Sequence, residues 1–185
     1  MVTKFKFPPL PANPTHEAIV QHYIRFRRPV LHAELDWFAT RPSFDVLLDD
    51  AVHARDQWGK RLSHQRRLVK HVIPTAYQTL KGLRAALQRA PTFDDLFALI
   101  EGALGPIPRA GDLYSYDTTM RIGAFLRLYP TRVFLQTGAL AGARKLSRTY
   151  SARSIPLAQF PEPFHALAPF EVENLLCCYK SALRP

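Results

Sequence analysis

The stretch from Thr92 to Pro106, TFDDLFALIEGALGP, carries the clearest helix signal in the chain. Thr92 is a favourable N-cap residue, and the two aspartates that follow Phe93 suit the positive end of a helix. Gly105 and Pro106 predict where the helix ends. Apolar residues recur at the spacing of one helix face, at Phe93, Leu96, Phe97, Ile100 and Leu104.

The same helical spacing recurs on both sides of this stretch. We expect a helix from Pro14 that ends at the sequence RRP of residues 27–29, and another that begins after Ser43 as its N-cap. Pro74 predicts a kink or break in a long apolar stripe. Residues 132–137, RVFLQT, fit either a short strand or a buried extended piece. Further helices are expected over residues 31–38, 63–87, 116–128, 138–146 and 169–183.

These patterns predict an all-α protein. We expect a single compact multi-helix domain over residues 14–185, with about seven to eight helices. The opening segment, residues 1–13, is rich in proline and should form an extended arm. The 185 residues are 47% hydrophobic and 22% charged, which is ordinary for a globular protein with its own core.

Several classes of protein do not fit the sequence. No apolar stretch approaches the roughly 20 residues that cross a bilayer, and the start lacks the apolar core of a signal peptide, so we expect no membrane partner and a cytoplasmic location. The two cysteines, Cys177 and Cys178, are adjacent and are not expected to pair. No metal-binding spacing is present, so neither a metal nor another cofactor is expected.

The net charge of +10 is unevenly distributed. Residues 55–89 hold nine basic side chains and one acidic side chain, and residues 118–161 hold seven basic and none acidic. Between them, residues 90–117 hold one basic and five acidic side chains. Two basic blocks of this kind favour a polyanionic partner.

The first basic block predicts a phosphate-binding site. If a helix begins at Ser63, its free N–H groups point the same way as Lys60 and Arg61 and can bind phosphate. Trp58 would then be placed to stack on a base or an arginine. The alternative is a solvated basic face with Trp58 in the core. The candidate nucleic-acid-binding residues of this block are Lys60, Arg61, Ser63, His64, Arg66, Arg67 and Lys70.

The second block offers a smaller candidate site. Arg144, Lys145 and Arg148 follow a glycine-rich turn, which would place backbone N–H groups and cations near a helix end. The alternative is a solvated surface. The chain lacks the phosphate-binding pattern GxxxxGK[ST], so a nucleotide P-loop is not expected.

No catalytic motif stands out, but one polar cluster remains a candidate for an enzyme or small-ligand site. Tyr114, Tyr116, Asp117 and Arg121 fall in an otherwise apolar stretch, and the last two form an i, i+4 pair. They can bind a ligand or move a proton. In the structural alternative, Asp117 caps a helix, Arg121 holds it by an ion pair, and the tyrosine hydroxyls lie at the surface.

Three segments together resemble a family of small uncharacterised bacterial proteins with no assigned activity. Two are GKRLSHQRR, residues 59–67, and LAPFEVENLLCCYK, residues 167–180; the third is the segment 105–146, which contains LYSYDTTMRIG. In this chain Phe134 and Gln136 stand where the family pattern has tyrosine and histidine. The resemblance implies a bacterial cytosolic protein.

A weaker similarity links residues 134–146, FLQTGALAGARKL, to helix-hairpin-helix DNA-binding modules. The segment has a predicted helix and two glycines, Gly138 and Gly142, but lacks the Gly-hydrophobic-Gly sequence of that hairpin. With the charge distribution, this leads us to expect a non-enzymatic protein that binds DNA or RNA through phosphates. The alternatives are an enzyme or ligand binder built on the tyrosine cluster, and an interaction protein that meets an acidic partner or a second copy of itself.

Overall fold

The computed structural model describes residues 7–62, 65 and 71–185. Their contacts divide the chain into two compact units. The terminal unit combines the residues up to Leu31 with Thr131–Pro185, and the central unit is the continuous segment His32–Pro130. The expectation of a single domain over residues 14–185 stays a prediction.

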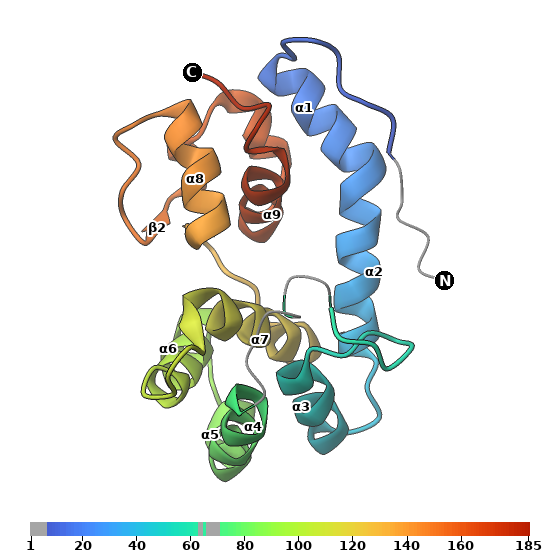
Figure 1. The fold of residues 1–185 in the computed structure, drawn as a ribbon, viewed down its shortest axis with the longest axis vertical. Coiled ribbons are helices and arrows are strands. Elements are labelled where there is room, and N and C mark those ends of the chain that lie inside the picture. Colours follow the sequence, from blue (N-terminus) through green and yellow to red (C-terminus); the bar gives the residue numbers. More distant parts are fainter. Residues whose placement is uncertain (1–6, 63–64, 66–70) are drawn as a thin grey trace. The chain divides into compact units, whose positions relative to one another are not determined.

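The terminal unit is mostly helical and has one pair of short strands (Figure 1). Val133 pairs with Ile155 and Phe134 with Ser154 in antiparallel register, so the stretch RVFLQT contains a short strand. The elements are α1 His16–His22, β1 Val133–Phe134, α8 Thr137–Leu146, β2 Ser154–Ile155 and α9 Pro169–Tyr179, with 3-10 turns at Leu157–Gln159 and Glu162–Ala166.

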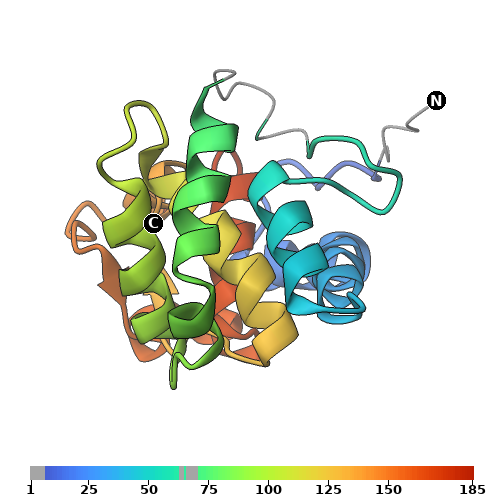
Figure 2. The same cartoon turned by 90° about the horizontal axis from the view of Figure 1, so that it is seen from below.

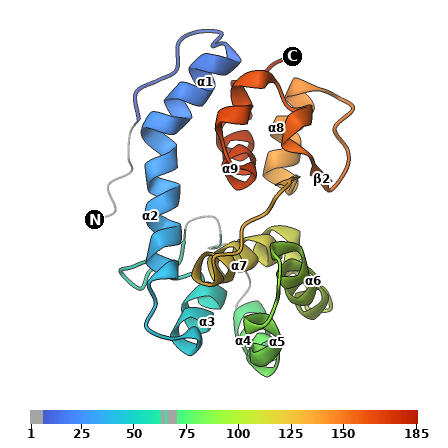
Figure 3. The same ribbon diagram turned by 180° about the vertical axis from the view of Figure 1, so that it is seen from behind.

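Two glycines allow α8 to pack closely against α9, and Figure 3 shows these helices side by side. A Cβ atom on Gly142 would lie 2.2 Å from the carbonyl oxygen of Leu176, and one on Gly138 would lie 2.5 Å from Sγ of Cys177. Both glycines lie inside α8 rather than in a turn before it. The glycines that prompted the comparison with a DNA-binding hairpin therefore serve helix packing.

The predicted helix end at residues 27–29 is wrong. After α1, which Thr15 caps through a 3.2 Å bond from the Ala18 N–H, the chain forms a π-helical turn over Tyr23–Arg27 and continues directly into α2, Arg28–Ala39. The Arg28 N–H bonds to the Tyr23 carbonyl, five residues earlier. This wider turn lets the helix pass Pro29, which has no N–H to donate.

The central unit is built from helices alone among its described residues. Helix α7 packs against both α6 and α3 (Figure 2). The chain enters this unit within α2. Its further helices are α3 Phe44–His53, α4 Val72–Gly82, α5 Arg84–Gln88, α6 Phe93–Leu104 and α7 Gly111–Leu126.

Two helix starts predicted from capping residues, at Ser43 and Thr92, are confirmed, whereas the first helix, expected from Pro14, begins at His16 with Thr15 as its N-cap. The Asp95 N–H bonds to the Thr92 hydroxyl at 3.2 Å, and the Val46 N–H bonds to the Ser43 hydroxyl at 3.3 Å. Pro74 lies in the first turn of α4, which begins at Val72 and where proline is tolerated. Most of the predicted stripe before this helix falls outside the described residues, so the expected kink or break stays a prediction. The five apolar residues predicted to form one face of α6 are all buried.

The all-α class is confirmed. Helices dominate the described residues, and the strands named above are two residues long each. Within the described ranges, every helix is too short or too polar to span a bilayer. Helix α7 begins at Gly111, five residues before the start expected from apolar spacing, because small and polar residues fill its first turns.

Candidate nucleic-acid interface

A short hydrogen-bonded turn after α3 presents the described part of the first basic block. Arg55 and Arg61 pair across it in an antiparallel bridge. The Gly59 N–H bonds to the Asp56 carbonyl at 2.9 Å, and the Asp56 N–H bonds to the Lys60 carbonyl at 2.8 Å. Gly59 has a φ of 71°, which suits glycine at the left-handed position of a three-residue hairpin loop. We name residues 55–61 the tryptophan turn.

The carboxylate of Asp56 fixes this turn from inside. Its Oδ1 accepts the Trp58 N–H at 3.0 Å and the Lys60 N–H at 2.8 Å. This role of Asp56 was not predicted, although aspartate at the first and glycine at the fourth position of a turn is a known signal, present here as Asp56-Gln-Trp-Gly59.

Trp58 lies on the outside of the tryptophan turn. Its exposure is 69%, the highest among the exposed large hydrophobic residues of the described chain. The alternative that placed this indole in the core is therefore wrong. A large aromatic side chain on a fixed turn, open to solvent, offers a flat surface on which a base can stack.

The cations next to the indole are also accessible. Lys60 and Arg61 are both exposed, and Lys60 has no carboxylate partner among the described residues. Arg55, by contrast, pairs with Asp49 and with Asp50, so its charge is neutralised within the protein. The other predicted members of this block, Ser63, His64, Arg66, Arg67 and Lys70, lie outside the described residues.

The chain that follows the turn is tied back to the helices. The Leu62 N–H bonds to the Ala54 carbonyl at 2.8 Å. Gln65 is buried, with 2% exposure, and its side-chain amide donates to Oδ2 of Asp117 at 2.5 Å. The segment on either side of Ser63 and His64 is thus held by hydrogen bonds to α3 and α7.

The polar cluster on α7 fastens the end of α3. The Arg121 guanidinium, 2% exposed, donates to the Ala51 carbonyl at 3.2 Å and lies 3.8 Å from the Asp117 carboxylate. The Tyr114 hydroxyl donates to the Val52 carbonyl at 2.7 Å. Both carbonyls belong to the last turn of α3, where helix acceptors lack intrahelical i+4 donors. The Ala51 carbonyl also accepts the Ala54 N–H at 3.2 Å, so Arg121 adds a second donor there.

This geometry corrects details of the structural alternative. Asp117 lies in the middle of α7 and does not cap it, whereas the predicted ion pair with Arg121 is present. The tyrosine hydroxyls are buried, since Tyr114 and Tyr116 are each 2% exposed. The Tyr116 ring packs against Phe93 and Phe97 of α6.

Electrostatics keep Tyr114 in its donating form. Burial raises the pKa of the Tyr114 phenol well above its usual value, and the charges of Arg121 and Arg61 act in the opposite direction. An ordinary phenol is already protonated at neutral pH, so the raised pKa extends to more alkaline pH the range over which Tyr114 donates to the Val52 carbonyl. The polar cluster therefore has a structural role, because its hydrogen bonds position the chain that carries the tryptophan turn.

The cations of the second basic block lie at the C-terminal end of a helix, whereas a helix end with free N–H groups was expected. Arg144 and Lys145 are in the last turn of α8, and Arg148 follows the helix. Free carbonyls, not N–H groups, occur at this end, so the predicted backbone phosphate cradle is absent from the helix end that bears these cations. The three cations instead line a shallow cavity of about 400 Å³ together with Ala141, Ser147 and Pro185.

No group of three or more histidine, cysteine, aspartate or glutamate side chains is arranged for a metal within the described ranges.

Comparison of the chain with family models, curated proteins and solved structures gives no match.

Proposed function

We propose that the protein binds single-stranded nucleic acid, DNA or RNA, without catalysing a reaction on it. Trp58 stacks on an unpaired base, and Lys60 and Arg61 contact the neighbouring phosphates. On the basis of the sequence alone, the proposal also includes the basic residues through Lys70 as phosphate contacts. Arg144, Lys145 and Arg148 are proposed as a separate phosphate-binding site.

The observation that carries the proposal is the 69% exposure of Trp58 on a turn fixed by Asp56. Leaving an indole in water forgoes roughly 1.5–3 kcal/mol of burial energy, so such a position favours a ligand that covers the ring. The fixed turn also limits the conformational entropy lost on binding.

The chemistry next to the ring selects the class of ligand. Lys60 and Arg61 supply positive charge on the strand that leaves the turn, and the segment 55–89 carries a large basic excess. Stacking on an aromatic ring combined with phosphate contacts is the pattern of single-strand binding, because bases in a duplex are already stacked. A purely acidic protein partner would use the charge but not the stacking surface.

The test is binding of labelled single-stranded DNA and RNA, followed by anisotropy and by quenching of tryptophan fluorescence at several salt concentrations. Trp58→Ala should weaken binding by about 1–3 kcal/mol, the range for one stacked base. Lys60→Gln should reduce the slope of log K against log salt by about 0.7, the value for one phosphate of a single strand.

Matched variants make the result decisive. Arg109, an exposed cation of the same unit that lies outside both basic blocks, offers Arg109→Gln as a control that should leave the salt slope unchanged. The double variant Arg66→Glu, Arg67→Glu tests two residues of the first basic block that lie outside the described residues and are proposed from the sequence alone. The proposal fails if Trp58→Ala binds as the wild type does. It also fails if heparin or polyglutamate binds equally well and leaves the Trp58 fluorescence unquenched, since charge alone would then explain the binding.

A further inference from the structure

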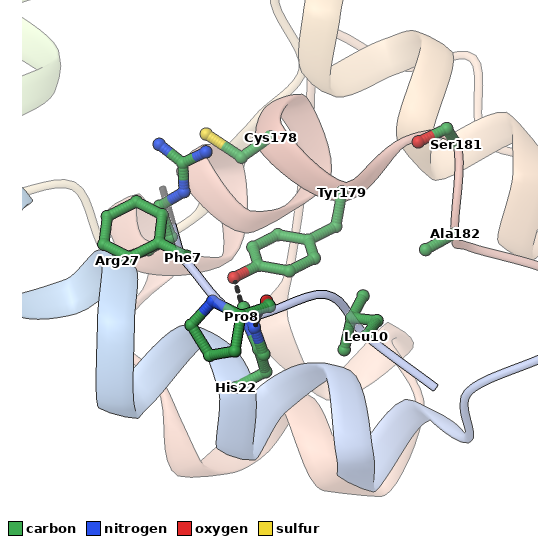
Figure 4. Close-up of a pocket in the computed structure, with 9 residues that line it drawn as sticks. All are labelled: Phe7, Pro8, Leu10, His22, Arg27, Cys178, Tyr179, Ser181 and Ala182. Atoms are coloured by element: carbon green, nitrogen blue, oxygen red, sulfur yellow. Dashed lines mark hydrogen bonds between the residues drawn. The ribbon is translucent and has the colours of Figure 1, made fainter. Parts of the chain in front are cut away.

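A second feature, in the terminal unit, has no part in nucleic-acid binding. It is a cavity of about 270 Å³ between the start of the described chain, the end of α1 with its π-helical turn, and the end of α9. Figure 4 shows the lining, which has apolar and polar parts. The residues are Phe7, Pro8, Leu10, His22, Arg27, Cys178, Tyr179, Ser181 and Ala182.

The charge in this cavity is positive. Arg27 is its one permanently charged lining residue, and no aspartate or glutamate lines it among the described residues. Arg27 also has no carboxylate partner within ion-pair distance in the described ranges. Glu173 acts electrostatically on the nearby Cys178 thiol but is not part of the lining.

The guanidinium of Arg27 is held by stacking. Its central carbon lies 4.5 Å from the centroid of the Phe7 ring. A cation–π contact of this kind uses none of the N–H donors of the guanidinium, and a carboxylate can accept two of them. In Figure 4 this end of the cavity gathers Arg27, Phe7 and Cys178.

A hydrogen-bonded chain orders the polar groups next to Arg27. His22 Nε2 lies 2.7 Å from the Pro8 carbonyl oxygen, which can only accept, so Nε2 carries the proton. His22 Nδ1, 2.7 Å from the Tyr179 hydroxyl, is therefore the acceptor of that hydroxyl in the neutral ring. The oxygen of Tyr179 keeps its lone pairs for a donor such as Arg27 (Figure 4).

Covalent catalysis does not suit this cavity. Desolvation raises the pKa of the Cys178 thiol, with the charge of Arg27 acting in the opposite direction. The thiol is therefore protonated at neutral pH, and a protonated thiol is a poor nucleophile. The cavity is better suited to binding than to reaction.

We propose that this cavity binds a small organic carboxylate, with the carboxylate on Arg27 and the apolar part of the ligand against Phe7, Pro8 and Leu10. The volume lies near the lower end of ligand pockets, which limits the ligand to about the size of one ring. A carboxylate fits better than a phosphate, because among the described residues of the lining Arg27 is the one fixed cation, and it matches a single planar charge.

The experiment uses four probes: benzoate, hexanoate, neutral benzyl alcohol and inorganic phosphate. Binding is measured by ligand-observed NMR on the whole chain. Benzoate or hexanoate should bind more tightly than benzyl alcohol, and Arg27→Gln should weaken the carboxylate by about tenfold or more. Arg25→Gln is the matched control, because Arg25 is an exposed cation of the same π-helical turn that does not line the cavity.

A second readout covers the case in which Arg27→Gln does not fold. Bound benzoate should slow alkylation of Cys178 by iodoacetamide in the wild-type chain, as followed by tandem mass spectrometry that separates the two adjacent cysteines. The proposal is overturned if neither carboxylate binds and neither protects Cys178, if benzyl alcohol binds equally well, if phosphate binds in their place, or if a folded Arg27→Gln retains the affinity.

Discussion

Single buried hydrogen bonds decide where the tryptophan turn lies. Tyr114 donates to the Val52 carbonyl at the end of α3, and Arg121 adds a second donor to the Ala51 carbonyl. Asp117 accepts a hydrogen bond from Gln65, which follows the turn in the chain. Because a buried carbonyl without a donor is costly, these side chains are more than filling for the core. They connect the α7 helix to a surface loop.

The variant Tyr114→Phe tests how much one of these buried hydrogen bonds stabilises the fold. It removes the hydroxyl that donates to the Val52 carbonyl and should lower the free energy of unfolding by about 1–3 kcal/mol in urea titration. Tyr129→Phe, at a site 40% exposed, is the control and should change it by less than about 0.5 kcal/mol. Equal effects of the two changes would show that the Tyr114 hydrogen bond stabilises the fold no more than the hydroxyl of Tyr129 does.

The sequence could predict these residues as a group but not their roles. The i, i+4 spacing of Asp117 and Arg121 is visible along one helix, and that pair is present. Their other partners, Gln65 and the Ala51 carbonyl, are 52 and 70 positions away in the chain, so only the packing of α7 against α3 reveals them. The exposure of Trp58 likewise depends on the bonds made by Asp56.

At the scale of elements, capping chemistry was the more reliable signal and proline the less reliable one. Ser43 and Thr92 begin their helices as predicted, because a cap acts within three residues of itself. Pro29 was expected to stop a helix and does not. The π-helical turn before it lets the helix continue although Pro29 has no N–H to donate. A local sequence pattern does not show whether the chain can make that adjustment.

The close contact between α8 and α9 leads to a prediction for two glycine variants, whose stabilities should change in opposite directions. Gly142→Ala places a methyl group against the Leu176 carbonyl and should destabilise the protein by about 1–3 kcal/mol, the cost of overpacking. Gly102→Ala, inside α6 where a Cβ meets no atom within 4 Å, should instead stabilise it by about 0.5–1 kcal/mol. Thermal or urea unfolding of both variants checks the pair.

That prediction is wrong if both alanines stabilise the protein, since α8 would then have room to move away from α9 without cost. If both destabilise it by the same amount, the effect belongs to glycine in helices generally and not to the close contact.

At the scale of the whole molecule, tyrosines with raised pKa values link stability to alkaline pH. Burial is the first cause of raised pKa values at Tyr23, Tyr114, Tyr129, Tyr150 and Tyr179. The folded state therefore keeps these protons at pH values where the unfolded chain has lost them. Their contribution is fully present below the ordinary tyrosine pKa of about 10 and is lost as pH rises through the higher folded values.

We expect the free energy of unfolding to fall steeply above about pH 10, with tyrosinate absorbance rising as the protein unfolds. Tyr114→Phe should make that fall shallower, because it removes one phenol of raised pKa. Full tyrosinate absorbance from a chain that remains folded would contradict the expectation.

The division of the chain in two also sets an order of events during synthesis. The central unit is continuous in sequence, whereas α1 needs α9 and the 3-10 turn at Glu162–Ala166 to cover it. At 5–20 residues per second, the ribosome takes roughly 5–20 seconds to make the segment between the two halves of the terminal unit. For that interval the apolar side of α1, with Ile19, Val20 and Tyr23, leaves the ribosome without its partner and is a natural target for a holding chaperone.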